Sequence, residues 1–233
     1  MSSVRALRVW DLPTRLFHWS LVLLFALLWF TGEKGEAFAA AMGVLGVRVD
    51  DAMNWHVGCG YGVLGLLLFR LLWGFLGSDT ARFGYFLRSP LTAARYLVRV
   101  LRGGNGDAPG HNPAGGWMVV ILLAGLLVQV GSGLFAYDDY GFEGPLAHLV
   151  GEQLGQGLLA LHRANVNVLL SLVGLHLAAI AFYALVKRDN LIRPMLSGRK
   201  VFPGDQVEPR MASPWLALAC ALAAGGVAWW LVG

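Results

Sequence analysis

The stretch that decides the fold covers residues 162–176 and reads HRANVNVLLSLVGLH. Histidines stand at both ends, and the residues between them are mostly apolar, as in a membrane-spanning helix. Fourteen residues at about 1.5 Å each put His176 roughly 21 Å from His162, and because fourteen residues are close to four helical turns, both rings face one side. Ionisable side chains inside a membrane span are costly and indicate a function. We therefore expect this helix to carry functional side chains at two depths.

The composition of the whole chain agrees with a membrane protein. Hydrophobic residues make up 57% of the 233 residues and charged residues only 14%, against about 25% charged residues in soluble domains. Stretches of membrane-spanning length occur at residues 17–31, 57–76, 116–136, 166–186 and 214–232. We predict an all-α integral membrane helical bundle, with a four-helix core in residues 1–200 and a linker and fifth transmembrane helix in residues 201–233.

Positive charge is distributed unevenly around these spans. With the amino terminus inside, only Lys34, Arg48 and Arg163 of the 18 lysines and arginines fall in outer segments. This asymmetry predicts a cytoplasmic amino terminus. The excess of positive charge, net +4, therefore reflects the orientation of the chain in the membrane. It does not indicate a nucleic-acid partner, and we expect none.

Two further histidines lie at the depths of the first two. His56 opens the second span, level with His162, whereas His18 enters the first span about 22 Å below the outer boundary, level with His176. Neutral imidazole is a good iron ligand, so the pairs His56/His162 and His18/His176 each predict a haem with two histidine ligands, which suits electron transfer. A zinc site is disfavoured, because the two histidines of one helix are too far apart to share one ion.

Other residues refine this interpretation. Because the sequence contains no C-x-x-C-H motif, covalent haem attachment is not indicated. His148 has no partner at its depth, and we do not expect it to be a ligand. Several glycines flank the ligand histidines, where a small residue lets a flat porphyrin approach the backbone: Gly58, Gly62, Gly65 and Gly174.

At these residues the chain resembles the prokaryotic di-haem cytochrome b family, which includes bacterial cytochrome b561 and the b-type subunits of nickel-iron hydrogenases and formate dehydrogenases. The resemblance covers the first four helices. Besides the spaced pair His162 and His176, it rests on VWDLPTRLFHW at 9–19, HVG at 56–58, RLLWGF at 70–75 and GHNP at 110–113. It implies two b haems on the four histidines, paired as their depths suggest, in a multi-pass protein of the bacterial inner membrane.

The resemblance also implies where electrons enter and leave. Members of the family pass electrons between a quinone near the inner haem and an extracytoplasmic redox protein, such as a c-type cytochrome or a hydrogenase or dehydrogenase subunit. His111 and Asn112 are then candidates for a quinone site, although Asn112 before Pro113 is also a good helix cap. Arg15 and Arg163 are candidates for contacts with haem propionates, although Arg15 also fits a role in orientation alone.

These features leave several functions open. The leading hypothesis is transmembrane electron transfer between a quinone pool and the outer redox protein. The alternatives are a membrane-anchoring cytochrome b subunit of a hydrogenase or dehydrogenase and a quinone-linked oxidase of a small species such as superoxide. The sequence does not decide whether the chain is itself an enzyme.

Three surface segments complete the expectations. An Arg-rich amphipathic helix is expected on the inner surface within residues 77–115. The outer connection at 137–161 is acidic, which suits either a docking partner or ordinary solubility. The fifth helix carries no histidine and is expected to pack against a partner or a second copy of the chain.

Overall fold

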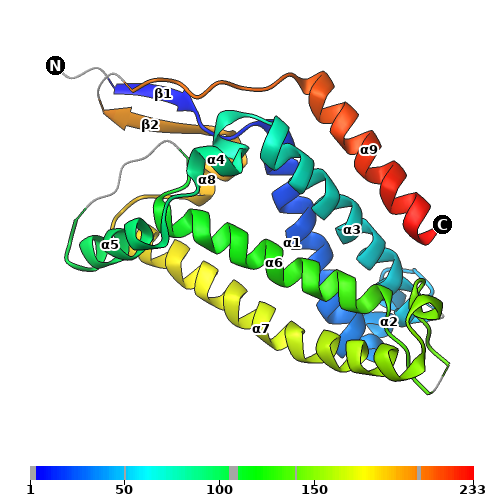
Figure 1. The fold of residues 1–233 in the computed structure, drawn as a ribbon. Coiled ribbons are helices and arrows are strands. Elements are labelled where there is room, and N and C mark those ends of the chain that lie inside the picture. Colours follow the sequence, from blue (N-terminus) through cyan, green and yellow to red (C-terminus); the bar gives the residue numbers. More distant parts are fainter. Residues whose placement is uncertain (1–3, 50, 105–109, 140, 204–205) are drawn as a thin grey trace.

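A computed structural model describes residues 4–49, 51–104, 110–139, 141–203 and 206–233 (Figure 1). Within these residues, five helices are long and apolar enough to cross a membrane. They are α1 (Leu12–Glu33), α3 (Ala52–Leu76), α6 (Pro113–Leu134), α7 (Glu152–Leu185) and α9 (Pro214–Val232). The predicted five-span, mainly helical bundle is confirmed.

Side-chain caps explain why several helices begin before the predicted spans. Asp11 accepts a hydrogen bond from the Thr14 amide at 2.7 Å at the start of α1, and Asp51 does the same for the Met53 amide of α3 at 2.8 Å. Such caps satisfy amides that lack a partner within the helix. A hydropathy window responds only to the apolar stretch, so the capped first turns were not included in the predicted spans.

Helix α7 is much longer than the predicted 166–186. Its 34 residues extend about 51 Å, beyond a hydrocarbon core of about 30 Å. The first turns are held against the segment after α6, because the Tyr137 amide donates to the Gly155 carbonyl at 3.3 Å. His162 therefore lies inside α7 rather than at its outer mouth, and the outer connection is shorter than predicted.

The transmembrane helices form two closely packed pairs, α1 with α3 and α6 with α7, and α3 also contacts α6 (Figure 1). Helix α9 packs on α3 of its own chain rather than leaving that face to a partner. Its buried seam consists of the small residues Ala217, Cys220, Ala224 and Ala228, which allow the close helix approach common in membranes. The expected contact of α9 with a partner or a second copy stays a prediction.

Short elements cover the end of the bundle where α1 begins, called the inner end below. A two-stranded antiparallel sheet joins β1 (Val4–Arg8) to β2 (Arg199–Pro203) and was not predicted. Next to it lie η1 (Asp79–Ala81), α4 (Phe83–Phe86), α5 (Pro90–Leu101) and α8 (Ile192–Ser197). Helix α5 is the expected amphipathic helix, with Ala93, Tyr96 and Val100 on its buried face.

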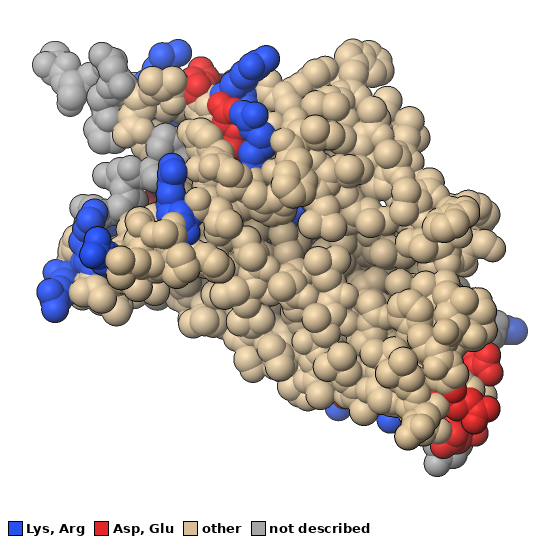
Figure 2. All heavy atoms as spheres, viewed as in Figure 1, with Lys and Arg blue, Asp and Glu red and all other residues tan. Residues whose placement is uncertain are grey.

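The opposite, outer end carries α2 (Gly35–Val44), η2 (Ala147–Leu149) and the start of α7. Figure 2 shows lysines and arginines gathered at the end formed by β1, β2 and α5, and acidic residues gathered at the opposite end. This arrangement agrees with the positive-inside rule. The cytoplasmic location of the inner end stays a prediction.

Candidate functional site

The outer pair of histidines comes from opposite helix pairs. The ring centres of His56 on α3 and His162 on α7 lie 6.1 Å apart, with an angle of 76° between the ring planes. Two metal–imidazole bonds of about 2 Å each, together with the distance from each nitrogen to its ring centre, add to about 6 Å. The spacing between the rings therefore fits one metal ion held between them.

Backbone carbonyls orient both rings. The Nδ1 atom of His56 lies 3.0 Å from the Leu28 carbonyl oxygen on α1, and that of His162 lies 2.8 Å from the Gln129 carbonyl oxygen on α6. A carbonyl only accepts, so each Nδ1 carries the donated hydrogen and each Nε2 keeps its lone pair. This is the arrangement of a metal-ligating imidazole.

Glycines allow each ring to lie close to a neighbouring helix. A Cβ atom on Gly32 would stand 2.9 Å from Cε1 of His56, and one on Gly133 would stand 2.9 Å from Cε1 of His162. Carbon atoms do not pack that closely, so any larger residue would displace the ring. The two glycines therefore set the positions of the two imidazoles.

The supports on α1 and α6 repeat one pattern. A hydroxyl precedes each glycine, with Thr31 Oγ1 at 3.2 Å from Nδ1 of His56 and Ser132 Oγ at 3.5 Å from Nδ1 of His162. The sequence analysis did not predict a role for either Thr31 or Ser132. The available signal was a hydroxyl residue followed by glycine near the outer ends of the first and third spans.

A polar network fixes the helix that carries His162. The Gln129 amide donates to the His162 carbonyl at 3.1 Å and accepts from the Asn165 amide at 2.7 Å. The Asn165 amide also donates to the Gly125 carbonyl at 3.0 Å. Because hydrogen-bonded side chains join membrane helices, this network holds α7 in register with α6.

The inner pair, His18 on α1 and His176 on α7, also comes from opposite helix pairs. The two residues interact electrostatically, and both influence His111 at the start of α6. The Nδ1 atom of His18 is buried and has no hydrogen-bond partner in the described part of the chain. Buried polar atoms are normally satisfied, so His18 lacks the Nδ1–carbonyl contact that orients the outer pair, and the ligand role of the inner pair stays a prediction.

Further buried polar atoms without a partner in the described residues lie at the same end of the bundle. They belong to Thr14, Arg15, Arg70, Thr80 and His111. Proteins leave few such atoms, and each calls for an explanation. Among the described residues, no three His, Cys, Asp or Glu side chains meet to form a metal site. The donor set thus fits paired imidazole ligands beside a group with polar edges.

The glycines that flank the ligand histidines in the sequence have different surroundings in the structure. A Cβ on Gly62 would lie 3.0 Å from Leu24 Cδ1, and one on Gly65 would lie 4.0 Å from the Ala228 Cβ. Gly62 therefore serves the packing of α1 on α3, and Gly65 that of α9 on α3, which corrects the expectation of a porphyrin there. A Cβ on Gly58 or Gly174 would meet no atom within 4 Å, and their expected role stays a prediction.

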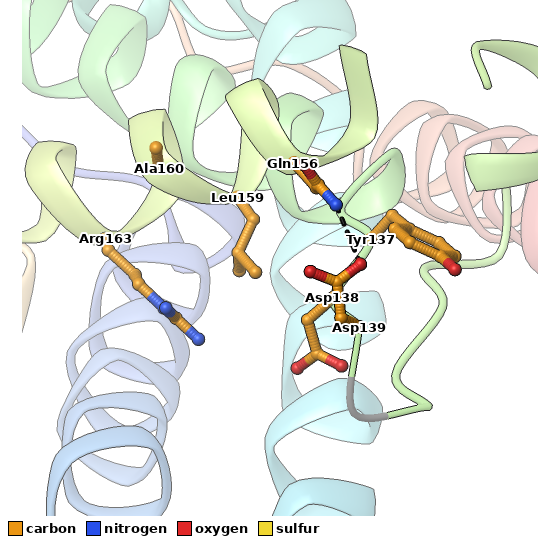
Figure 3. Close-up of a pocket in the computed structure, with 7 residues that line it drawn as sticks. All are labelled: Tyr137, Asp138, Asp139, Gln156, Leu159, Ala160 and Arg163. Carbon is orange, nitrogen blue, oxygen red and sulfur yellow. Dashed lines mark hydrogen bonds between the residues drawn. The ribbon is translucent and has the colours of Figure 1, made fainter. Parts of the chain in front are cut away.

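The two arginines expected at haem propionates lie in different surroundings. The Arg15 Nη1 donates to the Leu196 carbonyl and so ties α1 to the end of α8. Arg163 lies beside His162 and lines a pocket at the outer surface (Figure 3). In that pocket the Gln156 amide donates to Asp139 at 2.8 Å. Propionate contacts of either arginine stay predictions.

Asn112 acts as the cap of α6. Its Oδ1 accepts from the Gly115 amide at 2.7 Å, and its Nδ2 donates to the Tyr183 hydroxyl at 3.2 Å. Both ends of its amide are therefore occupied. The ring of His111, by contrast, lies 4.7 Å from the Trp10 ring and 4.7 Å from the Phe86 ring, measured between centres.

His111 is neutral at physiological pH. Burial lowers the pKa of His111 to about 3; the neighbouring Arg70, His176 and His18 also lower it, and a hydrogen bond with the Thr80 backbone raises it. A neutral imidazole has a single N–H, which the Thr80 backbone carbonyl accepts, and with so low a pKa the ring is a weak proton acceptor. A bound carbonyl would therefore replace the Thr80 carbonyl as the acceptor of this N–H, and proton uptake by His111 is disfavoured.

This pKa predicts how stability changes with pH. The unfolded chain binds a proton on His111 below about pH 6.5, whereas the folded chain does not until about pH 3. Stability therefore rises with pH across this window, and His111 costs about 2 kcal/mol at pH 5 relative to neutral pH. In thermal melts in detergent, His111→Gln should lose less stability between pH 7.5 and pH 5 than the wild type. An equal loss in both proteins, with His148→Gln as the control, would contradict the assignment.

Comparison with known protein families gives one clear result. Residues 9–198 match the family described as prokaryotic cytochrome b561, which covers most of the 233 residues. The chain belongs to this family of helical, multi-pass membrane proteins that bind b haem and transfer electrons across the membrane. The predicted resemblance is thereby confirmed, and α9 lies beyond the matched residues. No curated protein and no solved structure matches the chain significantly.

Proposed function

We propose that the chain carries electrons across the bacterial inner membrane through two b haems, one held by His56 and His162 and the other by His18 and His176. The observation that carries the proposal is the pair His56/His162, whose ring centres lie 6.1 Å apart with both Nδ1 atoms at backbone carbonyls. Haem supplies reversible one-electron chemistry when bound, and two imidazoles leave no open position for oxygen.

Helix α7 supports the proposal of a second haem. It carries His162 and His176 fourteen residues apart, which is about 21 Å along a helix. That separation covers much of a hydrocarbon core of about 30 Å. Redox centres at these two levels provide a route for electrons between the two surfaces.

At the inner end, the proposed electron partner is a quinone. His111 is neutral, and its ring centre lies 4.7 Å from that of Trp10 and 4.7 Å from that of Phe86. Aromatic surfaces suit a flat, apolar ring, and an imidazole N–H suits its carbonyl oxygen. His111 is a better candidate than Asn112, because the amide of Asn112 is used by the cap and by Tyr183.

At the outer end, the proposed partner is a redox protein with a basic surface, such as a c-type cytochrome. Glu152, together with burial and with Asp139, Glu143 and Asp138, raises the pKa of the Tyr137 phenol. The shift reports a negative potential where α6 ends and α7 begins. Such a potential attracts a positively charged partner and speeds its association.

The proposal is tested on the purified full chain in detergent. We expect a reduced-minus-oxidised spectrum of low-spin b haem, two haem irons per polypeptide, reduction by a quinol and reoxidation by a basic c-type cytochrome. Fewer than two irons, or haem that exchanges electrons with neither quinol nor quinone, would contradict the proposal. Stable co-purification with a soluble metal-containing subunit would favour the anchoring role instead.

A further inference from the structure

Arg70 on α3 is an arginine buried without a full set of partners. Its side chain is only 3% exposed, and its Nη1 atom has no hydrogen-bond partner within the described residues. Nor does Arg70 form a salt bridge within the described part of the chain. A buried charge is costly unless it is paired and hydrogen-bonded. The arrangement therefore calls for an acceptor that the described residues do not supply.

The position of Arg70 along α3 places it at the level of the inner histidines. Arg70 follows His56 by fourteen residues, the same spacing that separates His162 from His176 on α7. Because fourteen residues are close to four helical turns, Arg70 projects from the side of α3 that carries His56. Arg70, His18 and His176 each interact electrostatically with His111, so all four residues lie toward the inner end of the bundle.

The neighbours of Arg70 hold its side chain, and the Asp11 carboxylate attracts it electrostatically without forming a salt bridge to it. The ring of Phe83 lies 4.8 Å from the guanidinium carbon and covers one face of the cation. The nearby carboxylate of Asp11 is engaged elsewhere, accepting from the Thr14 amide at 2.7 Å and from Trp73 Nε1 at 3.2 Å. The guanidinium thus keeps a donor for a further anion.

We propose that Arg70 binds a propionate carboxylate of the inner haem. The propionates are the charged groups of haem, and a guanidinium matches a carboxylate with two parallel hydrogen bonds. Arg15, the residue expected in this role from the sequence, is only half-buried and donates to the Leu196 carbonyl, although its Nε also has no partner among the described residues. The inference rests on the inner haem of the proposed function and assigns Arg70 as a positioning residue for it.

The first test is a redox titration of the haem-loaded protein. In Arg70→Gln the potential of the inner haem should fall, because the lost positive charge stabilised the added electron, while the potential of the outer haem should stay unchanged. Arg70→Lys should restore most of the potential, since it keeps the charge. Arg15→Gln is the matched variant and should move the inner potential less than Arg70→Gln.

The second test measures the contact between Arg70 and the propionate directly. Protein stripped of haem is reconstituted with haem b or with its dimethyl ester, which lacks the two carboxylates. The inner site of the wild type should prefer haem b by about tenfold, the value of a charge-assisted hydrogen bond. In Arg70→Gln this preference should largely disappear, while the outer site keeps its own preference.

The outcomes separate this inference from the proposed function. Wild-type protein with fewer than two haems would count against the proposed function before any variant is made. With two haems present, the Arg70 assignment is overturned if Arg70→Gln keeps the tenfold preference for haem b. It is also overturned if Arg15→Gln, and not Arg70→Gln, lowers the inner potential.

Discussion

Replacing His56 or His162 with glutamine should remove one haem and leave the other in place. The two rings, 6.1 Å apart, fit opposite sides of one iron, so neither single variant keeps that iron ligated on both sides. Glutamine can still donate a hydrogen bond to the Leu28 or Gln129 carbonyl, but its amide is a poor iron ligand. We expect the haem iron per polypeptide to fall from two to one in each single variant and in the double variant.

The pairing is tested by combining variants. His18→Gln and His176→Gln should each remove the inner haem, and their combination should remove no more. A variant from each pair, such as His56→Gln with His18→Gln, should remove both haems. Loss within a pair is non-additive because both residues serve one iron, whereas loss across pairs is additive. His148→Gln in η2 is the control and should retain both haems.

Results that break this pattern would reject the pairing. If His56→Gln and His18→Gln together removed only one haem, the two residues would serve the same iron. Optical spectra, quantitation of haem and electron paramagnetic resonance of the remaining low-spin haem distinguish the cases.

The five spans were predictable because they depend on local quantities, and the expected levels of the four histidines rest on the same kind of quantity, while their ligation of haem stays a prediction. A span needs only an apolar stretch of the right length, as in 214–232, which α9 (Pro214–Val232) reproduces. The level of a histidine follows from counting residues at a fixed rise per residue. The ring positions of His56 and His162 agree with that count.

Other features were not predictable because they depend on contacts between distant segments. The sheet pairs Arg5 with Phe202, which lie near opposite ends of the sequence. No local sequence pattern predicts such a pairing. Helix α7 extends outward because the Gly155 carbonyl accepts from the Tyr137 amide. The burial of Arg70 beside Phe83 and near Asp11 likewise becomes visible only in three dimensions.

Replacing Gly133 with alanine should weaken binding of the outer haem by about tenfold or more, the effect of overpacking a tight site. The new Cβ would stand 2.9 Å from Cε1 and 3.0 Å from Nδ1 of His162, so the ring must move. Movement lengthens the 2.8 Å contact with the Gln129 carbonyl and changes the gap of 6.1 Å to the His56 ring. The measurement is the retention of each haem during washing in detergent.

The matched control lies two residues away on the same helix. A Cβ on Gly131 would meet no atom within 4 Å, so Gly131→Ala changes the helix propensity of α6 to the same extent without touching a ring. If both alanine variants lose the outer haem equally, the loss comes from α6 itself and the support for His162 is refuted. Gly32→Ala extends the test to α1, because its Cβ would meet the ring of His56 at 2.9 Å. The expected result is loss of the outer haem in Gly32→Ala and Gly133→Ala but not in Gly131→Ala. It would mean that α1 and α6 fix the geometry of the outer iron site although neither helix carries one of its two ligands.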